Sequence, residues 1–101
     1  MKYYVVEGKF KTFEFDLKAE ENAALFEKFA AFTDAAAAEG RLLCFGDKAH
    51  GVIGLVRGES LDELLSFFES DPLTLADVIE YRMTEIENIR LADDVSGFWR
   101  Q

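Results

Sequence analysis

The stretch LLCFGDKAHGVIGLV, from Leu42 to Val56, contains two apolar runs separated by a polar segment. The runs at 42–45 and 52–56 have the length of strands, and the segment between them contains two glycines. Short apolar runs bounded by turn residues are typical of buried strands. The stretch therefore predicts a β-hairpin with a loop of several residues at 46–51.

A helical pattern lies on each side of this hairpin. Residues 19–38 carry apolar side chains at helical spacing, and Gly40 suits the end of that helix. The tetrapeptide Ser60-Leu61-Asp62-Glu63 matches a capping box, in which the Ser60 hydroxyl accepts from the Glu63 amide and the Glu63 side chain returns to the Ser60 amide. A second helix is expected from there to the Asp71-Pro72 step, because proline disfavours helical backbone in the preceding residue.

Two further strands are predicted near the ends of the chain. Residues 3–15 are rich in aromatic and β-branched side chains and predict a strand with a bend or bulge near Gly8. Whether that strand continues past Phe10 or gives way to a loop is left open by an irregular alternation of apolar residues. Residues 78–86 alternate apolar and polar side chains and predict the last strand, with a helix as the alternative.

The order β-α-β-β-α-β predicts an α+β fold of the ferredoxin-like type, a four-stranded antiparallel sheet with two helices on one face. One domain is expected over residues 1–101, because a second core would leave each half too small to be stable. The other sheet face would meet water, yet the predicted strands have apolar residues at both odd and even positions, so both faces of the sheet would be apolar. A two-fold copy of the same sheet is the simplest cover, so a homodimer is expected.

Composition argues against several classes of partner. The chain has 20 acidic and 11 basic side chains, a formal net charge of -9, which disfavours nucleic acid and anionic membranes as partners. Its start lacks a signal-peptide pattern and no apolar run approaches the roughly 20 residues of a membrane span, so a cytoplasmic location is expected. With Cys44 as the only cysteine and His50 as the only histidine, neither a metal site nor a cofactor is expected.

From about Glu39 to Ile86 the chain resembles the YciI-like (YCII-related) family of dimeric α+β barrel proteins. The matching pieces, in order, are Glu39-Gly40-Arg41-Leu42-Leu43, Phe45-Gly46, a glycine-flanked strand, Ser60-Leu61-Asp62-Glu63, Asp71-Pro72-Leu73 and a strand with Glu80-Tyr81. The resemblance implies the same fold and a homodimer. In that family a His near the start of the first helix is commonly paired with the Asp of the Asp-Pro step as the suspected active centre. Asp71 matches this Asp, whereas residues 20–22 are Glu-Glu-Asn where the His is expected.

Two residues are candidates for acid-base chemistry. Asp71 could act as a general base in a pocket between the second helix and the sheet, with its pKa raised by burial. The simpler interpretation, which we favour, is that Asp71 caps the turn that begins at Pro72. His50 could titrate at the mouth of a pocket, although a single His in a glycine-flanked loop is usually a solvated residue.

Other residues are candidates for binding. Glu7, Glu80 and Arg82 would line a polar pocket if they face the space between two sheets, and the favoured alternative is a structural ion pair. Cys44 is interpreted as a small core residue rather than a nucleophile. Two large aromatic residues near the end of the chain, Phe98 and Trp99, would anchor to the partner subunit.

The leading functional hypothesis is a protein that binds a small organic molecule in a cleft between the sheet and the helices, with Asp71 as its acid-base residue. A non-catalytic dimeric accessory or interaction module is the rival hypothesis. A third is a cofactor-free oxygenase or isomerase of the dimeric α+β barrel group, which would need a deep aromatic-lined pocket holding a polar group. The identity of the ligand does not follow from these residues.

Overall fold

The chain alternates strands and helices in the order expected for a ferredoxin-like fold. The computed structural model describes residues 1–93. Its elements in chain order are β1 (Lys2–Phe10), the 3-10 turn η1 (Glu20–Asn22), α1 (Ala23–Ala38), β2 (Leu42–Lys48), β3 (Gly51–Gly58), α2 (Leu61–Glu69), α3 (Pro72–Leu75) and β4 (Ile79–Glu85). Within the described residues, none of the helices is both long and apolar enough to cross a bilayer. Phe98 and Trp99, expected to contact a partner, lie outside the described residues.

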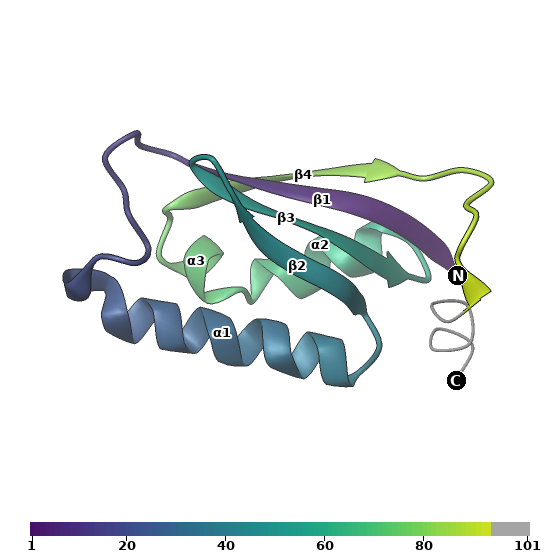
Figure 1. The fold of residues 1–101 in the computed structure, drawn as a ribbon, viewed down its shortest axis with the longest axis horizontal. Helices are drawn as coiled ribbons and strands as arrows, with labels where there is room; N and C mark the ends of the chain where they lie inside the picture. Colours follow the sequence, from purple (N-terminus) through teal and green to yellow (C-terminus); the bar gives the residue numbers. More distant parts are fainter. Residues whose placement is uncertain (94–101) are drawn as a thin grey trace.

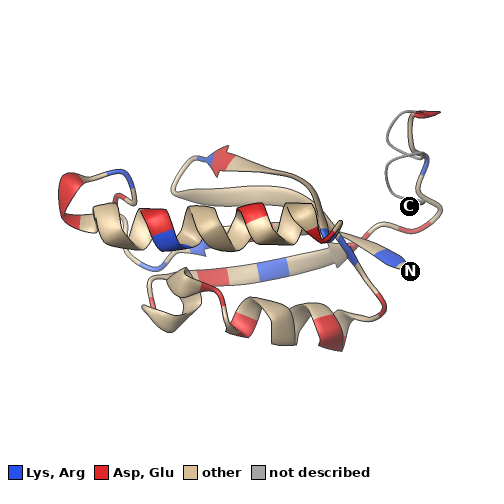
Figure 2. Cartoon of the chain, turned by 90° about the horizontal axis from the view of Figure 1, so that it is seen from below, with Lys and Arg blue, Asp and Glu red and all other residues tan. Residues whose placement is uncertain are grey.

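The four strands form one sheet in the order β2-β3-β1-β4, and each neighbouring pair is antiparallel. The three α-helices lie on the same side of this sheet (Figures 1 and 2). Acidic residues are spread along α1 and α2 and do not gather at one point (Figure 2). The predicted α+β ferredoxin-like fold is therefore confirmed.

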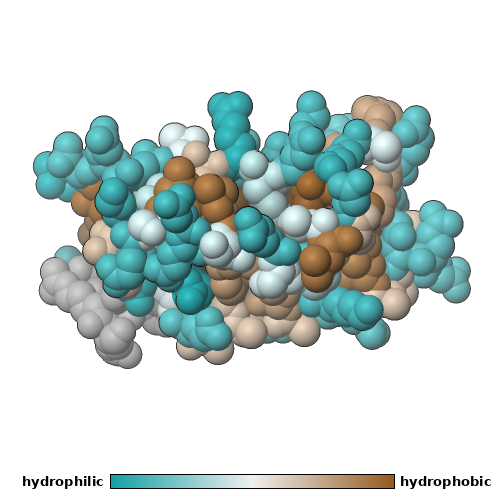
Figure 3. Space-filling view, turned by 180° about the vertical axis from the view of Figure 1, so that it is seen from behind, coloured by the Kyte–Doolittle hydropathy of each residue, from teal (hydrophilic) through white to brown (hydrophobic). Residues whose placement is uncertain are grey.

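The core lies between the sheet and the helices, and alternate residues of the strands build it. The buried apolar side chains of the strands are Tyr4, Val6, Leu42, Val52, Val56 and Ile79. Those of the helices are Phe29, Ala36, Leu64, Phe68 and Leu73. On the face seen from behind, hydrophobic side chains form separate patches between hydrophilic ones, so no continuous apolar surface is visible there (Figure 3).

The central hairpin is tighter than predicted. The strands extend to Lys48 and from Gly51, which leaves only Ala49 and His50 between them. His50, the second residue of this turn, has a φ of 58°, in the left-handed region. The expected loop of several residues is thus wrong, because the polar residues after Phe45 continue the strand ladder.

The irregularity expected in the first strand occurs in another strand. β1 keeps a continuous register with both neighbours through Gly8, and it ends at Phe10. Residues after Phe10 form a loop up to η1, which settles the question that the sequence left open. The sheet's register shift lies in β2, between Leu42 and Cys44. In a regular strand Leu42 and Phe45 would face opposite sides of the sheet, because one position is even and the other odd. The shift lets both side chains pack against the core.

Local side-chain and backbone chemistry explains the end of α1 and the start of α2. Gly40, just past α1, has a φ of 79°, as expected for a glycine that ends a helix. At α2 the Ser60 hydroxyl accepts from the Glu63 amide at 3.1 Å, which confirms half of the capping box. The Glu63 side chain accepts from the amide of Glu59 at 3.0 Å rather than from that of Ser60, so the return bond is displaced by one residue.

We call the sheet surface that carries no helix the helix-free face. Its apolar side chains are Tyr3, Val5, Cys44, Ile53 and Leu55, and its charged ones are Glu7, Lys9, Lys48, Arg57, Glu80 and Arg82. Cys44 is exposed on this face, opposite Leu55, so it is not the core residue that the parity predicted. The prediction failed because the register shift in β2 turns Cys44 away from the helices.

Candidate functional site

Asp71 is fully buried, with 0% exposure, at the start of α3. Its carboxylate accepts from the Leu73 amide at 3.3 Å, and this N-cap bond confirms the favoured interpretation of the Asp-Pro step. The same carboxylate accepts from the Thr74 hydroxyl at 3.2 Å and from the Tyr81 hydroxyl at 2.5 Å. Asp71 therefore links α3 to β4 through three donors.

Tyr81 reaches Asp71 because of a glycine in the neighbouring strand. Gly8 stands opposite Tyr81 in the β1–β4 register. A Cβ added to Gly8 would lie 2.8 Å from the Tyr81 ring and 2.6 Å from Ile79, too close for real contacts. The missing side chain of Gly8 thus makes the space in which the Tyr81 ring lies, and the ring directs its hydroxyl to Asp71.

Burial dominates the ionisation of this pair. The pKa of Asp71 is raised, first because burial disfavours the charged carboxylate, while the hydrogen bonds from Tyr81, Leu73 and Thr74 oppose the shift. The pKa of Tyr81 is also raised, first by burial and then by the neighbouring Asp71 charge. Tyr81 therefore stays a neutral hydrogen-bond donor, and Asp71 holds a proton more tightly than an exposed aspartate does.

A cleft of about 340 Å³ lies at the hairpin end of the sheet, and we call it the loop-end cleft. It lies between the loop that follows β1 and the β2–β3 hairpin, which approach each other at one end of the molecule (Figure 1). Its lining residues are Phe10, Phe13, Glu14, Phe15, Asp16, Leu17, Lys18, Asp47, Lys48, His50 and Gly51. His50 is thus at a cleft, as one of the two sequence interpretations proposed.

Aromatic rings form much of the wall of the loop-end cleft. The Phe13 ring lies against the imidazole of His50, with centroids 4.4 Å apart and planes inclined by 40°. The rings of Phe10 and Phe15 meet edge to face at 4.9 Å. Phe13 is 76% exposed although it is strongly apolar, so its ring is available to a molecule that enters the cleft.

Charged side chains of both signs line the same cleft. Lys18 and Asp47 form an ion pair at 2.5 Å that joins the loop to β2, and this pairing raises the pKa of Lys18. The Lys48 ammonium lies 3.9 Å from the Glu7 carboxylate, which is longer than a hydrogen bond. The Lys48 ammonium is therefore not held by a short hydrogen bond to Glu7, which leaves its N–H donors for an oxygen atom of a bound molecule.

A second hollow of about 250 Å³, the helix groove, lies between α1 and the β2–β3 pair. It shares Leu17, Lys18 and Asp47 with the loop-end cleft. Its other lining is mostly apolar, with Phe26 and Phe29 from α1 and Phe45 from β2 among its residues. The two hollows thus meet at the Lys18–Asp47 ion pair.

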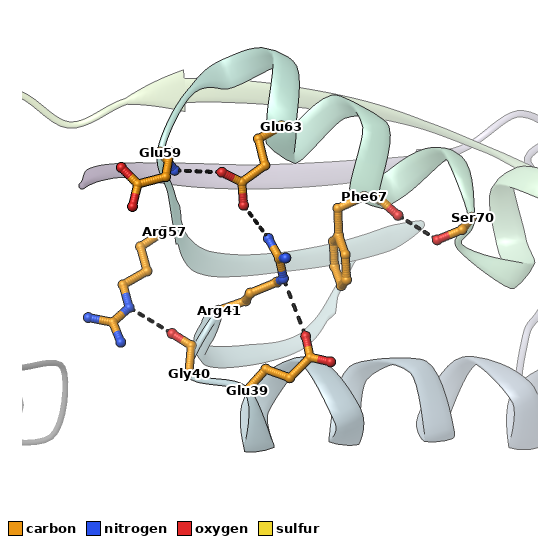
Figure 4. Close-up of polar contacts among 8 residues, drawn as sticks. All are labelled: Glu39, Gly40, Arg41, Arg57, Glu59, Glu63, Phe67 and Ser70. Carbon is orange, nitrogen blue, oxygen red and sulfur yellow. Dashed lines mark hydrogen bonds and ion pairs between the residues drawn. The ribbon is translucent and has the colours of Figure 1, made fainter. Parts of the chain in front are cut away.

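A third hollow of about 370 Å³, the Arg41 pocket, lies at the opposite end of β3. Both of its arginines are already paired. Nη1 of Arg41 donates to Glu63 at 2.6 Å and Nε donates to Glu39 at 3.3 Å, while Nε of Arg57 donates to the Gly40 carbonyl at 2.7 Å. The Arg41 guanidinium also lies 4.8 Å from the Phe67 ring centroid, and Figure 4 shows it between these groups. The contacts tie the start of β2 to α2, so this cluster is explained by structure alone.

The three charged residues predicted to bind ligand lie elsewhere. Glu7 stands opposite Arg82, and Glu80 stands opposite Lys9, on the helix-free face. None of Asp71, Glu7, Glu80 and Arg82 lines any of the three hollows described above. Within residues 1–93, no group of three or more His, Cys, Asp or Glu side chains is placed to hold a metal ion.

Sequence reasoning missed most of the loop-end cleft. For residues 10–17 the sequence left a continued strand and a loop as alternatives, and Lys18, Asp47 and Lys48 were not singled out. One signal could have found the cleft. Phe13 and Phe15 flank a glutamate in a segment rich in charged side chains, where large apolar residues need a cover that the fold or a ligand supplies.

No protein-family model matches the chain, and no curated protein sequence matches it. Among solved structures, its fold is similar to that of the 5-chloro-2-hydroxyhydroquinone dehydrochlorinase TftG from Burkholderia phenoliruptrix AC1100, in complex with 2,5-dihydroxybenzoquinone. The similarity covers 91% of this chain and 97% of that one, with a TM-score of 0.56 and 16% sequence identity. Such a likeness shows a shared fold. The YciI-like assignment itself stays a prediction.

Proposed function

We propose that this protein binds a small organic molecule in the loop-end cleft. The observation that carries the proposal is the joint presence of aromatic rings and charged groups of both signs in one hollow of about 340 Å³. Ligand sites combine a mostly apolar lining with a few polar groups that orient the ligand. The protein of similar fold described above is in complex with a small organic molecule, which is compatible with this use of the fold.

The proposal differs in place from the one drawn from the sequence. The expected cleft lay between sheet and helices, with Asp71 as its acid-base group. In the proposed site the ligand lies beyond the sheet's end, and its polar neighbours are Lys48, Lys18 and Asp47. Asp71 then serves α3 and β4 as a buried cap, and His50 contributes a ring to the cleft wall.

A fragment screen followed by amide NMR of the full-length chain tests this proposal. We expect bound fragments to shift amide signals from residues 13–18 and 47–51, with little change at Gly40 and Gly58 in the Arg41 pocket. Replacing Lys48 with Met should weaken the binding of oxygen-containing fragments about tenfold or more, since a hydrogen bond to a charged group contributes about 1.5–3 kcal/mol. Replacing the exposed Lys28 of α1 with Met is the matched control. Shifts that spread over the whole surface, or their absence for every fragment, would contradict the proposal.

We also propose that the helix-free face packs on a second copy of the chain. Val5, Leu55 and Cys44 stand side by side on that face in the β1–β3–β2 register, next to Ile53, which is 39% exposed. An apolar cluster on an uncovered sheet calls for a partner, and a two-fold dimer places the same patch on both subunits. The resemblance of residues 39–86 to a family of dimeric α+β barrel proteins also favours this partner.

Sedimentation velocity tests the dimer. We expect the unmodified chain to sediment as a dimer at micromolar concentration. Gly46 stands opposite Ile53 on the helix-free face, and a Cβ added there meets nothing within 4 Å. Gly46→Lys should therefore leave the folded protomer intact but place a charge in the interface and yield monomers, whereas Gly46→Ala should stay dimeric. A monomeric unmodified chain would rule this interface out.

A further inference from the structure

Four rings in the loop-end cleft suggest the chemical class of its ligand. Phe13, Phe10, Phe15 and the imidazole of His50 all line the same hollow. Aromatic rings attract one another in offset or edge-to-face contacts beyond what burial of their area supplies. The Phe13–His50 pair offers a tilted face, and the Phe10–Phe15 pair already makes an edge-to-face contact. A flat ring gains more from such walls than a puckered aliphatic ring of the same size.

The charges in the cleft restrict the ligand further. Three carboxylates and two ammonium groups line it, contributed by Glu14, Asp16, Asp47, Lys18 and Lys48. An aromatic carboxylate would enter a lining that is already acidic in balance, in a protein of net charge -9. A neutral hydroxyl group can lie beside the carboxylates and the ammonium groups of the cleft without this repulsion. It can donate to a carboxylate and accept from an ammonium group.

We propose that the loop-end cleft selects a neutral, hydroxylated aromatic ring, with Phe13 and His50 as its stacking wall and Lys48 as a donor to one of its oxygens. This inference rests on the proposed function, because it names the ligand class of the same cleft. It assigns specificity to Phe13, which is 76% exposed and therefore contributes little to the packing of the core.

Matched probe molecules separate the ring from its substituents. Resorcinol is the aromatic probe, cyclohexane-1,3-diol is its non-aromatic counterpart, and benzoate is the anionic aromatic counterpart. Each is titrated into the full-length chain, and dissociation constants come from the amide shifts of residues 13–18 and 47–51. We expect resorcinol to bind about threefold to tenfold more tightly than the diol, the range of one or two ring contacts. Benzoate should bind more weakly than resorcinol.

Two variants locate the effect. Phe13→Leu keeps an apolar side chain but removes the ring, so it should weaken resorcinol about threefold to tenfold and leave the diol unchanged. Phe26→Leu is the control, because Phe26 lies on α1 outside the loop-end cleft. Both residues are exposed, so neither variant should disturb the core.

The outcomes are distinguishable. Equal binding of resorcinol and the diol, tighter binding of benzoate, or an unchanged affinity in Phe13→Leu would overturn the ligand class. In each of those cases small-molecule binding in the cleft stands. If none of the three probes shifts the cleft amides while other fragments do, the ligand class is again wrong and the proposed function survives. If no fragment of any class binds there, the proposed function fails.

Discussion

Gly8 has no side chain at the point where three core side chains converge. A Cβ on Gly8 would lie 2.6 Å from Ile79, 2.8 Å from Tyr81 and 2.9 Å from Val52. The missing atom allows Tyr81 to cross beneath β1 and donate to Asp71. A single glycine thus positions the hydrogen bond that links β4 to the buried carboxylate.

We expect Gly8→Ala to destabilise the fold by about 1–3 kcal/mol, the usual cost of overpacking a filled core. Urea denaturation gives the free energy of unfolding. Gly46→Ala is the matched control: its Cβ enters open space and its backbone is not left-handed, so its stability should be unchanged or raised by up to about 1 kcal/mol. Equal stability of the two variants would contradict the packing role of Gly8.

Asp71 and Tyr81 carry a pH dependence of known sign. The folded-state pKa of Asp71 lies above its ordinary value of 3.8. Protonation therefore favours the folded state, and this contribution is fully present below pH 3.8 and is lost as pH rises through the folded-state pKa. Asp71→Asn keeps a cap oxygen but cannot titrate.

The stability of the unmodified chain relative to Asp71→Asn should therefore rise as pH falls from 7 toward 3.8. Asp71→Ala removes the cap and strands the buried Tyr81 hydroxyl, so it should cost about 2–4 kcal/mol at pH 7. Urea denaturation of the three proteins at a series of pH values checks both statements. A difference between the unmodified chain and Asp71→Asn that does not change with pH would show that Asp71 keeps its ordinary pKa.

The start of α2 illustrates how one side chain can serve two elements. Glu63 accepts from the Glu59 amide at the helix entrance and from Arg41 at the start of β2. Its pKa is lowered, first by the hydrogen bond from Arg41 and then by the Glu59 amide. The cap and the ion pair thus connect α2 to the turn after α1 (Figure 4).

Because the pKa of Glu63 is lowered, its contribution to stability changes with pH in the opposite direction to that of Asp71. The stabilising contribution of Glu63 should be present above pH 4.5, its ordinary pKa, and should be lost as pH falls through the lower folded-state value. Glu63→Gln should therefore be less stable than the unmodified chain at pH 7, with the difference shrinking in acid. Thermal unfolding across pH measures this. The exposed Glu69→Gln on the same helix should show no such trend, and a parallel trend in both variants would contradict the assignment.

The protomer as a whole has a covered face and an uncovered one. Helices cover one side of the sheet (Figure 1). Apolar and charged side chains share the other side. Cys44, the only cysteine, lies exposed on that uncovered face. Its thiol is therefore a natural reporter of whether a second copy covers the sheet.

If the dimer forms as proposed, Cys44 should react with a thiol reagent at least about tenfold more slowly in the unmodified chain than in Gly46→Lys, because buried thiols react slowly. Rates are measured at micromolar protein by the absorbance of the released thiolate. Fast and equal reaction in both proteins would indicate that the helix-free face stays open to solvent.

Local pattern was enough to predict the order of strands and helices, the cap at Ser60, the stop at Gly40 and the cap at Asp71. Each of these depends on neighbours within a few residues, so spacing and side-chain chemistry carry the information. Three features were missed: the length of the hairpin strands, the register shift in β2 and the site of exposed Cys44. Each depends on how strands pair, and a one-residue shift moves side chains to the opposite face without changing composition.

The candidate site depends almost wholly on long-range strand pairing rather than on local sequence. Phe13 and His50 are 37 positions apart in the sequence, and nothing in either neighbourhood indicates that their rings meet 4.4 Å apart. The antiparallel pairing of β1 with β3 brings the loop after Phe10 to the hairpin, and the ion pair between Lys18 and Asp47 joins them. Short-range chemistry therefore specifies the elements of this protein, whereas the cleft exists only because long-range strand pairing closes two distant loops around one space.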